Sequence, residues 1–119
     1  MKYTEEHEWL RLEGQVAVVG ITEHAAEQLG DLVFVELPEI GTEVSKDDEV
    51  VVIESVKEAS DILAPLSGKI IEVNESIVED PSLVNSDPAG QGWFFKIEVQ
   101  DMEALDTMMS KDEYDKFIS

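Results

Sequence analysis

Two branched apolar runs separated by a short polar stretch lie near the middle of the chain, between Val50 and Pro65. Runs of this kind that close through a few polar residues predict a β-hairpin. The predicted tip holds Lys57, the single lysine between Glu54 and Glu58, in a chain with 8 basic and 28 acidic residues. Exposed loops on rigid scaffolds tend to carry function. Lys57 is therefore interpreted as a covalent attachment point for a swinging cofactor, the alternative being a solvated lysine in a turn.

Short strands and turn signals occupy most of the remaining chain. Strands are predicted where branched or alternating apolar residues lie between turn residues, at 7–12, 15–21, 31–37, 43–44, 69–74 and 93–99. In the strand at 31–37, alternation predicts Val33, Val35 and Leu37 on one face. A helix is predicted at 22–29, with Thr22 as N-cap, and a short helical turn at 80–84, with Pro81 at its first position.

The end of the chain, from about 101 to 118, is predicted to be a helical tail. Asp101 is a candidate cap, and a second short helix is expected at 111–117. Many short strands with few helices favour a mainly β protein, a sandwich or flattened barrel with short helical inserts. A length of 119 residues fits a single domain spanning 1–119.

Composition excludes several classes of function. A net charge of -20 repels nucleic-acid phosphates and anionic membrane surfaces and favours encounter with basic protein surfaces. The chain has no cysteine, so neither disulfides nor thiol catalysis are expected. No apolar run is long enough to span a bilayer, and the first residues lack the features of a targeting segment. These features predict a soluble cytoplasmic protein.

No catalytic constellation emerges from the sequence. His7 and His24 are the only histidines, and neither has a partner at metal-ligand spacing. No glycine-rich phosphate loop or nucleophile elbow is present. We therefore expect no metal site and no self-contained enzyme.

The hairpin motif resembles that of a known family. Glu54-Ser55-Val56-Lys57, with Ala59-Ser60-Asp61 and Ala64-Pro65-Leu66-Ser67-Gly68 after it, is similar to the lipoyl-lysine hairpin of the glycine cleavage system H protein family. The resemblance runs from Tyr3 to Tyr114, with further family motifs at 7–9, 20–22, 29–31, 34–38 and 92–93. The shared order and spacing of these motifs make the match specific.

The resemblance implies a fold, a cofactor and a set of partners. The fold would be the hammerhead-type barrel-sandwich hybrid of lipoyl and biotinyl carriers, and lipoate would be amide-linked to Lys57. The chain would shuttle the aminomethyl group of glycine from the pyridoxal-phosphate-dependent glycine decarboxylase (P protein) to the tetrahydrofolate-dependent aminomethyltransferase (T protein). Dihydrolipoyl dehydrogenase (L protein) would reoxidise the arm, and a lipoate ligase or lipoyl/octanoyl transferase would attach it.

Further site residues follow from the same resemblance. The family's His-Glu-Trp region contributes to a cleft that holds the arm, which implies a role for Glu8, while Trp9 is expected in the core. Asp61, just after the tip, and Gln28, on the predicted helix, are further candidates for cofactor binding. Recognition of the hairpin by the attaching enzyme is expected to use Glu54, Ser55 and Val56.

Two departures and two alternatives qualify this reading. Glu58 stands where the family usually has alanine, and its charge beside Lys57 is expected to slow attachment without changing the tip; Ala26 stands where glutamine is common. The first alternative is a biotinyl domain or a 2-oxoacid dehydrogenase lipoyl domain, although Val56 replaces the methionine or aspartate usual there. The second is a lipoate-relay or interaction protein that donates its lipoyl group to other carriers.

Overall fold

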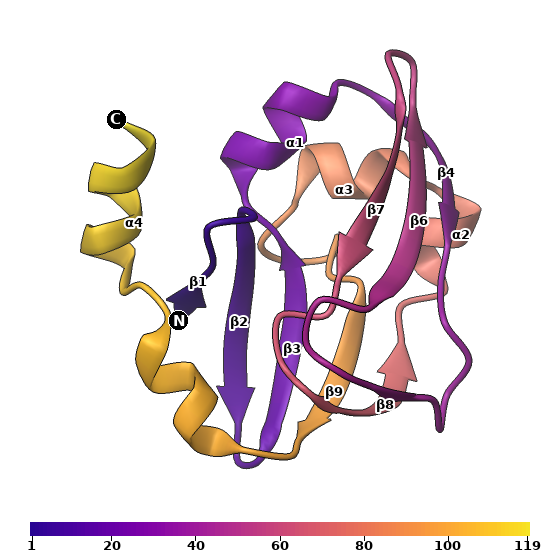
Figure 1. The fold of residues 1–119 in the computed structure, drawn as a ribbon. Coiled ribbons are helices and arrows are strands. Elements are labelled where there is room, and N and C mark those ends of the chain that lie inside the picture. The colour runs from indigo at the N-terminus through magenta and orange to yellow at the C-terminus, as the bar shows by residue number, and fades with distance from the viewer.

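Alternating apolar residues pair the strands into two antiparallel sheets in the computed structural model, which describes residues 1–119 (Figure 1). The larger sheet has the order β1 (Lys2–Tyr3), β2 (Glu8–Glu13), β3 (Val16–Ile21), β9 (Phe95–Val99), β8 (Gly68–Val73) and β5 (Glu43–Val44). The smaller has the order β4 (Leu32–Glu36), β6 (Glu49–Ser55) and β7 (Ala59–Leu63). The strands predicted from the sequence are all present, with ends that differ by up to two residues.

One apolar core joins the two sheets and is the main source of stability. It contains 19 buried residues contributed by both sheets and by the helices. Leu10, Val19 and Ile97 come from the larger sheet, while Val51 and Ile53 come from the smaller. Burial of this apolar surface holds the hairpin strands β6 and β7 against the body of the molecule.

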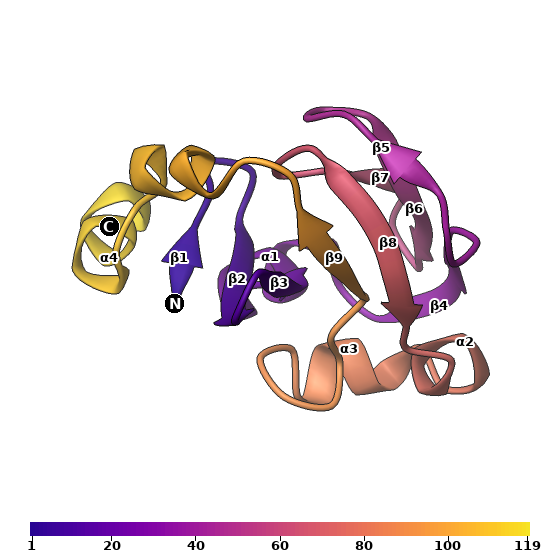
Figure 2. The same cartoon turned by 90° about the horizontal axis from the view of Figure 1, so that it is seen from below.

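A second, smaller cluster covers the opposite face of the larger sheet. Tyr3, Trp9, Val18 and Tyr114 form it, and Trp9 is only 1% exposed, as expected for a core aromatic. Tyr114 belongs to α4 (Lys111–Ile118), which begins with a capping box formed by Ser110 and Glu113. Figures 1 and 2 show α4 at the side of the molecule, next to the N-terminal strand. The helical tail thus completes the burial of the sheet.

Three short helices lie between strands. Helix α1 (Glu23–Leu29) begins at Thr22, whose hydroxyl accepts a hydrogen bond from the Ala25 amide, so the predicted N-cap is confirmed. Helices α2 (Ser76–Glu79) and α3 (Ser82–Ser86) follow β8 and lie one after the other in Figure 2. Both pack against β4, and α3 also contacts α1. The α2 turn and strand β1 were not predicted from the sequence.

The predicted faces of strand β4 are wrong in one respect. The pairing with β6 is irregular between Leu32 and Phe34, which is the signature of a β-bulge. The extra residue turns Val33 outward, where it is 59% exposed, and Leu32 takes the inward place with Val35. A bulge shifts the side-chain period by one residue, so strict alternation fails there.

The tail also differs from the prediction in its helix type. Met102–Thr107 forms a 3₁₀-helix, capped by Asp101 through the Glu103 amide, and the chain is extended at Met108. The expected second helix is present as α4. None of the helices has the length and apolar character needed to cross a membrane. No group of three or more acidic or histidine side chains is placed to hold a metal ion.

We predict that Gly20→Ala destabilises the fold by about 1–3 kcal/mol, because the new methyl group overpacks the core. Gly20 pairs with Trp9 across β2 and β3, and a Cβ there would lie 2.5 Å from Trp9 Cζ2. Trp9 cannot easily move, because its indole N–H donates to the Pro88 carbonyl at 2.9 Å. Urea unfolding measures the effect. The same substitution in a Trp9→Phe background should cost less, and an equal cost in both backgrounds would refute the steric cause.

Candidate functional site

The hairpin tip at residues 56–58 is a defined turn rather than a loose loop. Ser55 organises it, because its hydroxyl accepts hydrogen bonds from the amides of Lys57 and Glu58, each at 3.1 Å. The same hydroxyl donates to the Glu58 carbonyl at 3.1 Å, and the Ser55 amide donates to that carbonyl at 2.8 Å. One serine therefore fixes the backbone on both sides of Lys57, as expected for a turn built on a side-chain hydroxyl.

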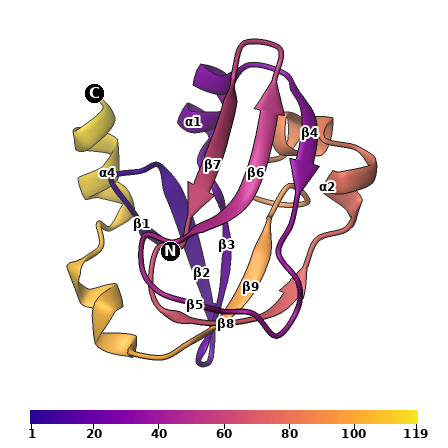
Figure 3. The same cartoon turned by 45° about the vertical axis from the view of Figure 1, so that its right-hand side comes forward.

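The segment between α1 and β4 supports the tip from the side. The Val56 amide donates to the Asp31 carbonyl at 3.0 Å. Figures 1 and 3 show this segment passing beside the end of the hairpin formed by β6 and β7. The tip is thus attached to the body of the protein at a point beyond the end of strand pairing.

Lys57 is exposed at this tip, as the sequence predicted. Its stem lies on the backbone of Gly30, where an added Cβ would stand 3.2 Å from Lys57 Cε. Gly30 ends α1 with φ 80° and ψ -167°, a conformation essentially restricted to glycine. The Lys57 ammonium group takes part in none of the protein's ion pairs, so the amine stands free at the end of a supported stem.

The three residues predicted for recognition of the hairpin divide into two roles. Glu54 is exposed, and Val56 is 67% exposed, so both present their side chains outward next to Lys57. The Ser55 side chain instead points into the tip, where its hydroxyl group is engaged in hydrogen bonds with the backbone of Lys57 and Glu58. A partner could contact Glu54 and Val56 directly, whereas Ser55 acts by shaping the turn.

A hollow lies between α1 and the hairpin. It has a volume of about 200 Å³ and brings together Gln28 from α1 and Asp61 from β7, two of the predicted cofactor-binding residues. Glu58 from the tip and Glu6 from the segment before β2 also line it. This arm-side hollow, as we call it, begins at the lysine tip and carries three carboxylates.

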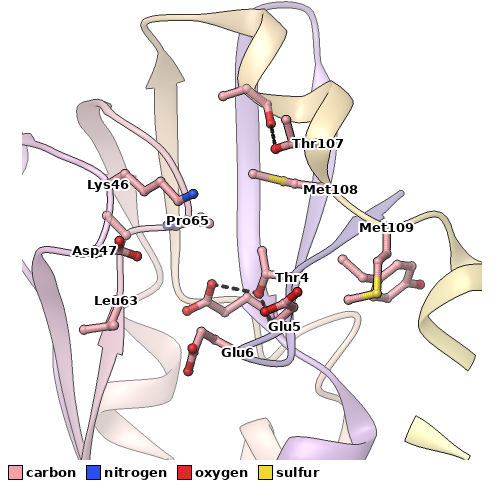
Figure 4. A pocket seen from close by; sticks show the side chains of 14 residues that line it. Thr4, Glu5, Glu6, Lys46, Asp47, Leu63, Pro65, Thr107, Met108 and Met109 are labelled. Atoms are coloured by element: carbon pink, nitrogen blue, oxygen red, sulfur yellow. Dashed lines mark hydrogen bonds between the residues drawn. The ribbon is translucent and has the colours of Figure 1, made fainter. Parts of the chain in front are cut away.

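Glu8, the third predicted residue, lines a different hollow. This second hollow has a volume of about 320 Å³ and separates the loop after β5 from the 3₁₀-helix (Figure 4). Lys46 and Asp47 lie on one wall and Thr107 and Met108 on the other. Glu6 lines both hollows, so the two are neighbours. The structure thus joins Asp61 with Gln28 but sets Glu8 apart from them.

Glu8 is the most perturbed carboxyl group in the protein. It is 3% exposed, and its burial raises its pKa to about 7; the carboxylates of Glu6 and Asp47 add to the rise. Its single side-chain partner is Thr4, whose hydroxyl donates at 3.1 Å and opposes the shift. Near neutral pH this side chain therefore switches between a neutral acid and a carboxylate, which the sequence alone did not reveal.

Sequence reasoning also missed how Glu6 and His7 are placed. His7 has a positive φ of 66°, and this turn of the backbone separates Glu6 from the strand that carries Glu8. The His7 ring bonds the Tyr114 hydroxyl through Nδ1 at 2.8 Å and lies 4.8 Å from the His24 ring. Burial and the neighbouring His24 lower the pKa of His7. In the sequence, the signal that could have pointed to Glu6 is its position immediately before His7 and Glu8.

Comparisons with known proteins agree on one family. The family model described as "Glycine cleavage H-protein" matches residues 1–119. A glycine cleavage system H protein of Carboxydothermus hydrogenoformans is 48% identical over 118 residues, 99% of this chain and 91% of that protein. One of Thermotoga maritima is 54% identical over 116 residues, 98% of this chain and 94% of that protein.

A solved structure extends the agreement to the fold. The crystal structure of a glycine cleavage system H protein from Mycobacterium marinum superposes with a TM-score of 0.89 at 39% identity. The match covers 98% of this chain and 94% of that one. The barrel-sandwich hybrid fold expected from the sequence is thereby confirmed.

We predict that Glu8→Gln changes the pH dependence of stability. Glu8 binds a proton more tightly in the fold than in the unfolded chain, so its contribution to stability falls as the pH rises from about 4.5 to about 7. At about 1.4 kcal/mol for each pH unit between the two pKa values, the loss is about 3 kcal/mol. The stability of Glu8→Gln relative to wild type should rise by that amount across this range.

Urea unfolding at a series of pH values measures this difference. Glu36→Gln, which removes an exposed carboxylate on β4, serves as the matched control and should show a much smaller change. A difference between Glu8→Gln and wild type that stays constant from pH 4.5 to pH 8 would contradict the raised pKa of Glu8.

Proposed function

The chain belongs to the glycine cleavage H-protein family, a family of lipoyl carriers, and from this premise we propose that Lys57 is the residue that carries the lipoyl group. The observation that carries the proposal is the tip itself. Lys57 is a free amine on a turn whose backbone is fixed on both sides by Ser55. An attaching enzyme must find its lysine in a constant position, and this tip provides one.

The surroundings of Lys57 suit a tethered arm with a cationic cargo. When attached, lipoate supplies a dithiolane that takes up the aminomethyl group of glycine and releases it to an acceptor. The arm-side hollow is lined by Glu58, the residue that follows Lys57, and also carries Glu6 and Asp61. Opposite charges at short range favour an ammonium group there over one in bulk water. The hollow thus fits the group that the family implies.

Each candidate residue can then be given a role toward the arm. Asp61 and Glu6 would face the ammonium group, and Gln28 would offer an amide for hydrogen bonding. Glu8 lies next to this hollow through Glu6, and a cation nearby would favour its carboxylate form over the neutral acid. Glu8 would therefore be more fully ionised when the cargo is present, and its negative charge would balance the ammonium group.

The partner enzymes belong to the proposal and rest on membership of the glycine cleavage system. We assign glycine decarboxylase as the enzyme that loads the arm, aminomethyltransferase as the one that unloads it, and dihydrolipoyl dehydrogenase as the one that reoxidises it. A lipoate ligase or lipoyl/octanoyl transferase would attach the cofactor in the cytoplasm. In this scheme the chain carries the group and its partners perform the chemistry.

We predict that Lys57→Arg abolishes lipoylation and carrier activity while leaving stability within about 0.5 kcal/mol of wild type. Arginine keeps the charge at an exposed site but cannot be acylated in this way. Peptide mass spectrometry after incubation with ligase, lipoate and ATP measures attachment, and urea unfolding measures stability. Lys46→Arg, on another exposed loop, is the control and should be modified like wild type. Lipoate found on a different lysine of the wild type, with Lys57 bare, would overturn the proposal.

We predict that Asp61→Asn and Glu8→Gln each shorten the lifetime of the loaded carrier severalfold after removal of the partner enzymes. The reason is the loss of a carboxylate that favours a nearby cation: Asp61 lines the arm-side hollow itself, and Glu8 lines the neighbouring hollow. Release of ammonia with time measures the lifetime, and lipoylation is verified first by mass. Glu36→Gln should behave like wild type. If Asp61→Asn and Glu8→Gln both decay at the wild-type rate, as the control does, the cargo is not held by these two carboxylates.

A further inference from the structure

Asn85 in α3 connects to the lysine tip through one short segment of backbone. The segment is residues 30–32, between α1 and β4. On one side it contacts the hairpin tip, and on the other it is bound by the Asn85 side chain. Its position therefore decides where the tip stands, and Asn85 is the side chain that fixes that position.

The contacts on the tip side involve two successive residues. The Asp31 carbonyl accepts the hydrogen bond of the Val56 amide at 3.0 Å. The Gly30 backbone lies under the Lys57 stem, close enough that an added Cβ would come 3.2 Å from Lys57 Cε. A shift of this segment would therefore move both the backbone before Lys57 and the support of its side chain.

The contacts on the other side come from a single amide group. Asn85 Nδ2 donates to the Gly30 carbonyl at 2.8 Å. Asn85 Oδ1 accepts from the Leu32 amide at 2.9 Å. The two bonds bracket Asp31, whose own side chain is exposed and whose carbonyl is the one that holds Val56.

Few side chains could replace Asn85 in this role. The segment presents one acceptor and one donor two residues apart, so its partner must donate and accept at the same time, as a primary amide does. Aspartate has the same shape but lacks the donor, and its charge would face the Gly30 carbonyl. Leucine has a similar volume but leaves both backbone groups without a partner, which costs free energy at a half-buried site.

We propose that Asn85 is a positioning residue for the acylation of Lys57, acting through residues 30–32. The inference rests on the proposed function, in which Lys57 is the lipoylated residue. Asn85 itself does not need to touch the attaching enzyme. It holds the tip so that the lysine amine stands in one place relative to the body of the carrier. Displacement of a reacting group by about 1 Å can cost about a hundredfold in rate.

The test compares two asparagines that bind backbone but differ in what they hold. Asn85→Asp removes the donor to Gly30. Asn74→Asp is the matched control, because Asn74 Nδ2 donates to the Gln91 and Trp93 carbonyls at 2.7 and 2.8 Å and the Asn74 side chain makes no hydrogen bond to residues 30–32. Both substitutions add the same charge. Asn85→Ser, which keeps a small donor and acceptor, is measured as well in case the aspartate variant folds poorly.

Two measurements separate positioning from stability. Lipoate ligase acting on the purified apo carrier with lipoate and ATP gives kcat and KM for each variant, at a temperature where all are folded. Hydrogen exchange followed by NMR gives the protection of the Val56 amide. Asn85→Asp should lower kcat/KM about tenfold or more and expose the Val56 amide to exchange. Asn74→Asp should leave both values near those of the wild type even where its urea midpoint is lower.

Other outcomes would overturn the inference in distinguishable ways. If Asn85→Asp and Asn85→Ser are lipoylated with wild-type kcat/KM, the residue does not position the lysine. If Asn74→Asp loses as much efficiency as Asn85→Asp, the effect is one of general stability. If the wild type is lipoylated at a lysine other than Lys57, the proposed function fails together with this inference, and mass spectrometry identifies that case.

Discussion

The hydrogen bond from the Val56 amide to the Asp31 carbonyl joins the end of the hairpin to the rest of the protein. Strand β7 lies at the edge of a three-stranded sheet, so cross-strand pairing alone would leave the tip free to fray. The bond prevents this, because residues 30–32 are themselves held by Asn85 and by the glycine-specific turn at Gly30. A carrier needs a mobile arm on a fixed base, and these contacts provide the base.

The distribution of charge around the base adds a second constraint. The net charge is -20, and most of the 28 acidic residues are exposed to solvent. Glu8 is different because it is buried, and burial makes its charge costly until a cation approaches. The general acidity and the single buried carboxyl group therefore act on different scales: the first is a long-range field over the surface, and the second responds to charges in its immediate surroundings.

The C-terminal helix contributes to the site from a distance. Tyr114 of α4 stacks on Tyr3 with ring centroids 4.9 Å apart, and its hydroxyl bonds both His7 and Thr22. His7 is the residue between Glu6 and Glu8, and Thr22 caps the helix that carries Gln28. The Tyr114 hydroxyl thus links the C-terminal tail both to the segment around His7 and to the start of α1. The tail is part of the fold rather than an appendage to it.

Local sequence patterns were sufficient to predict the hairpin, the exposed position of Lys57 at its tip, the Thr22 cap and most strands. Each of these features depends on neighbouring residues alone. The same patterns failed at Val33, where a bulge set by pairing with β6 overrides alternation. They also could not predict that Glu8 and Asp61 line different hollows, or that Glu6 and Gln28 line the same one. These placements depend on the packing of segments that are distant in the sequence. The raised pKa of Glu8 and the hold of Asn85 on residues 30–32 depend on burial and on contacts across more than fifty positions, and so only the tertiary structure could decide them.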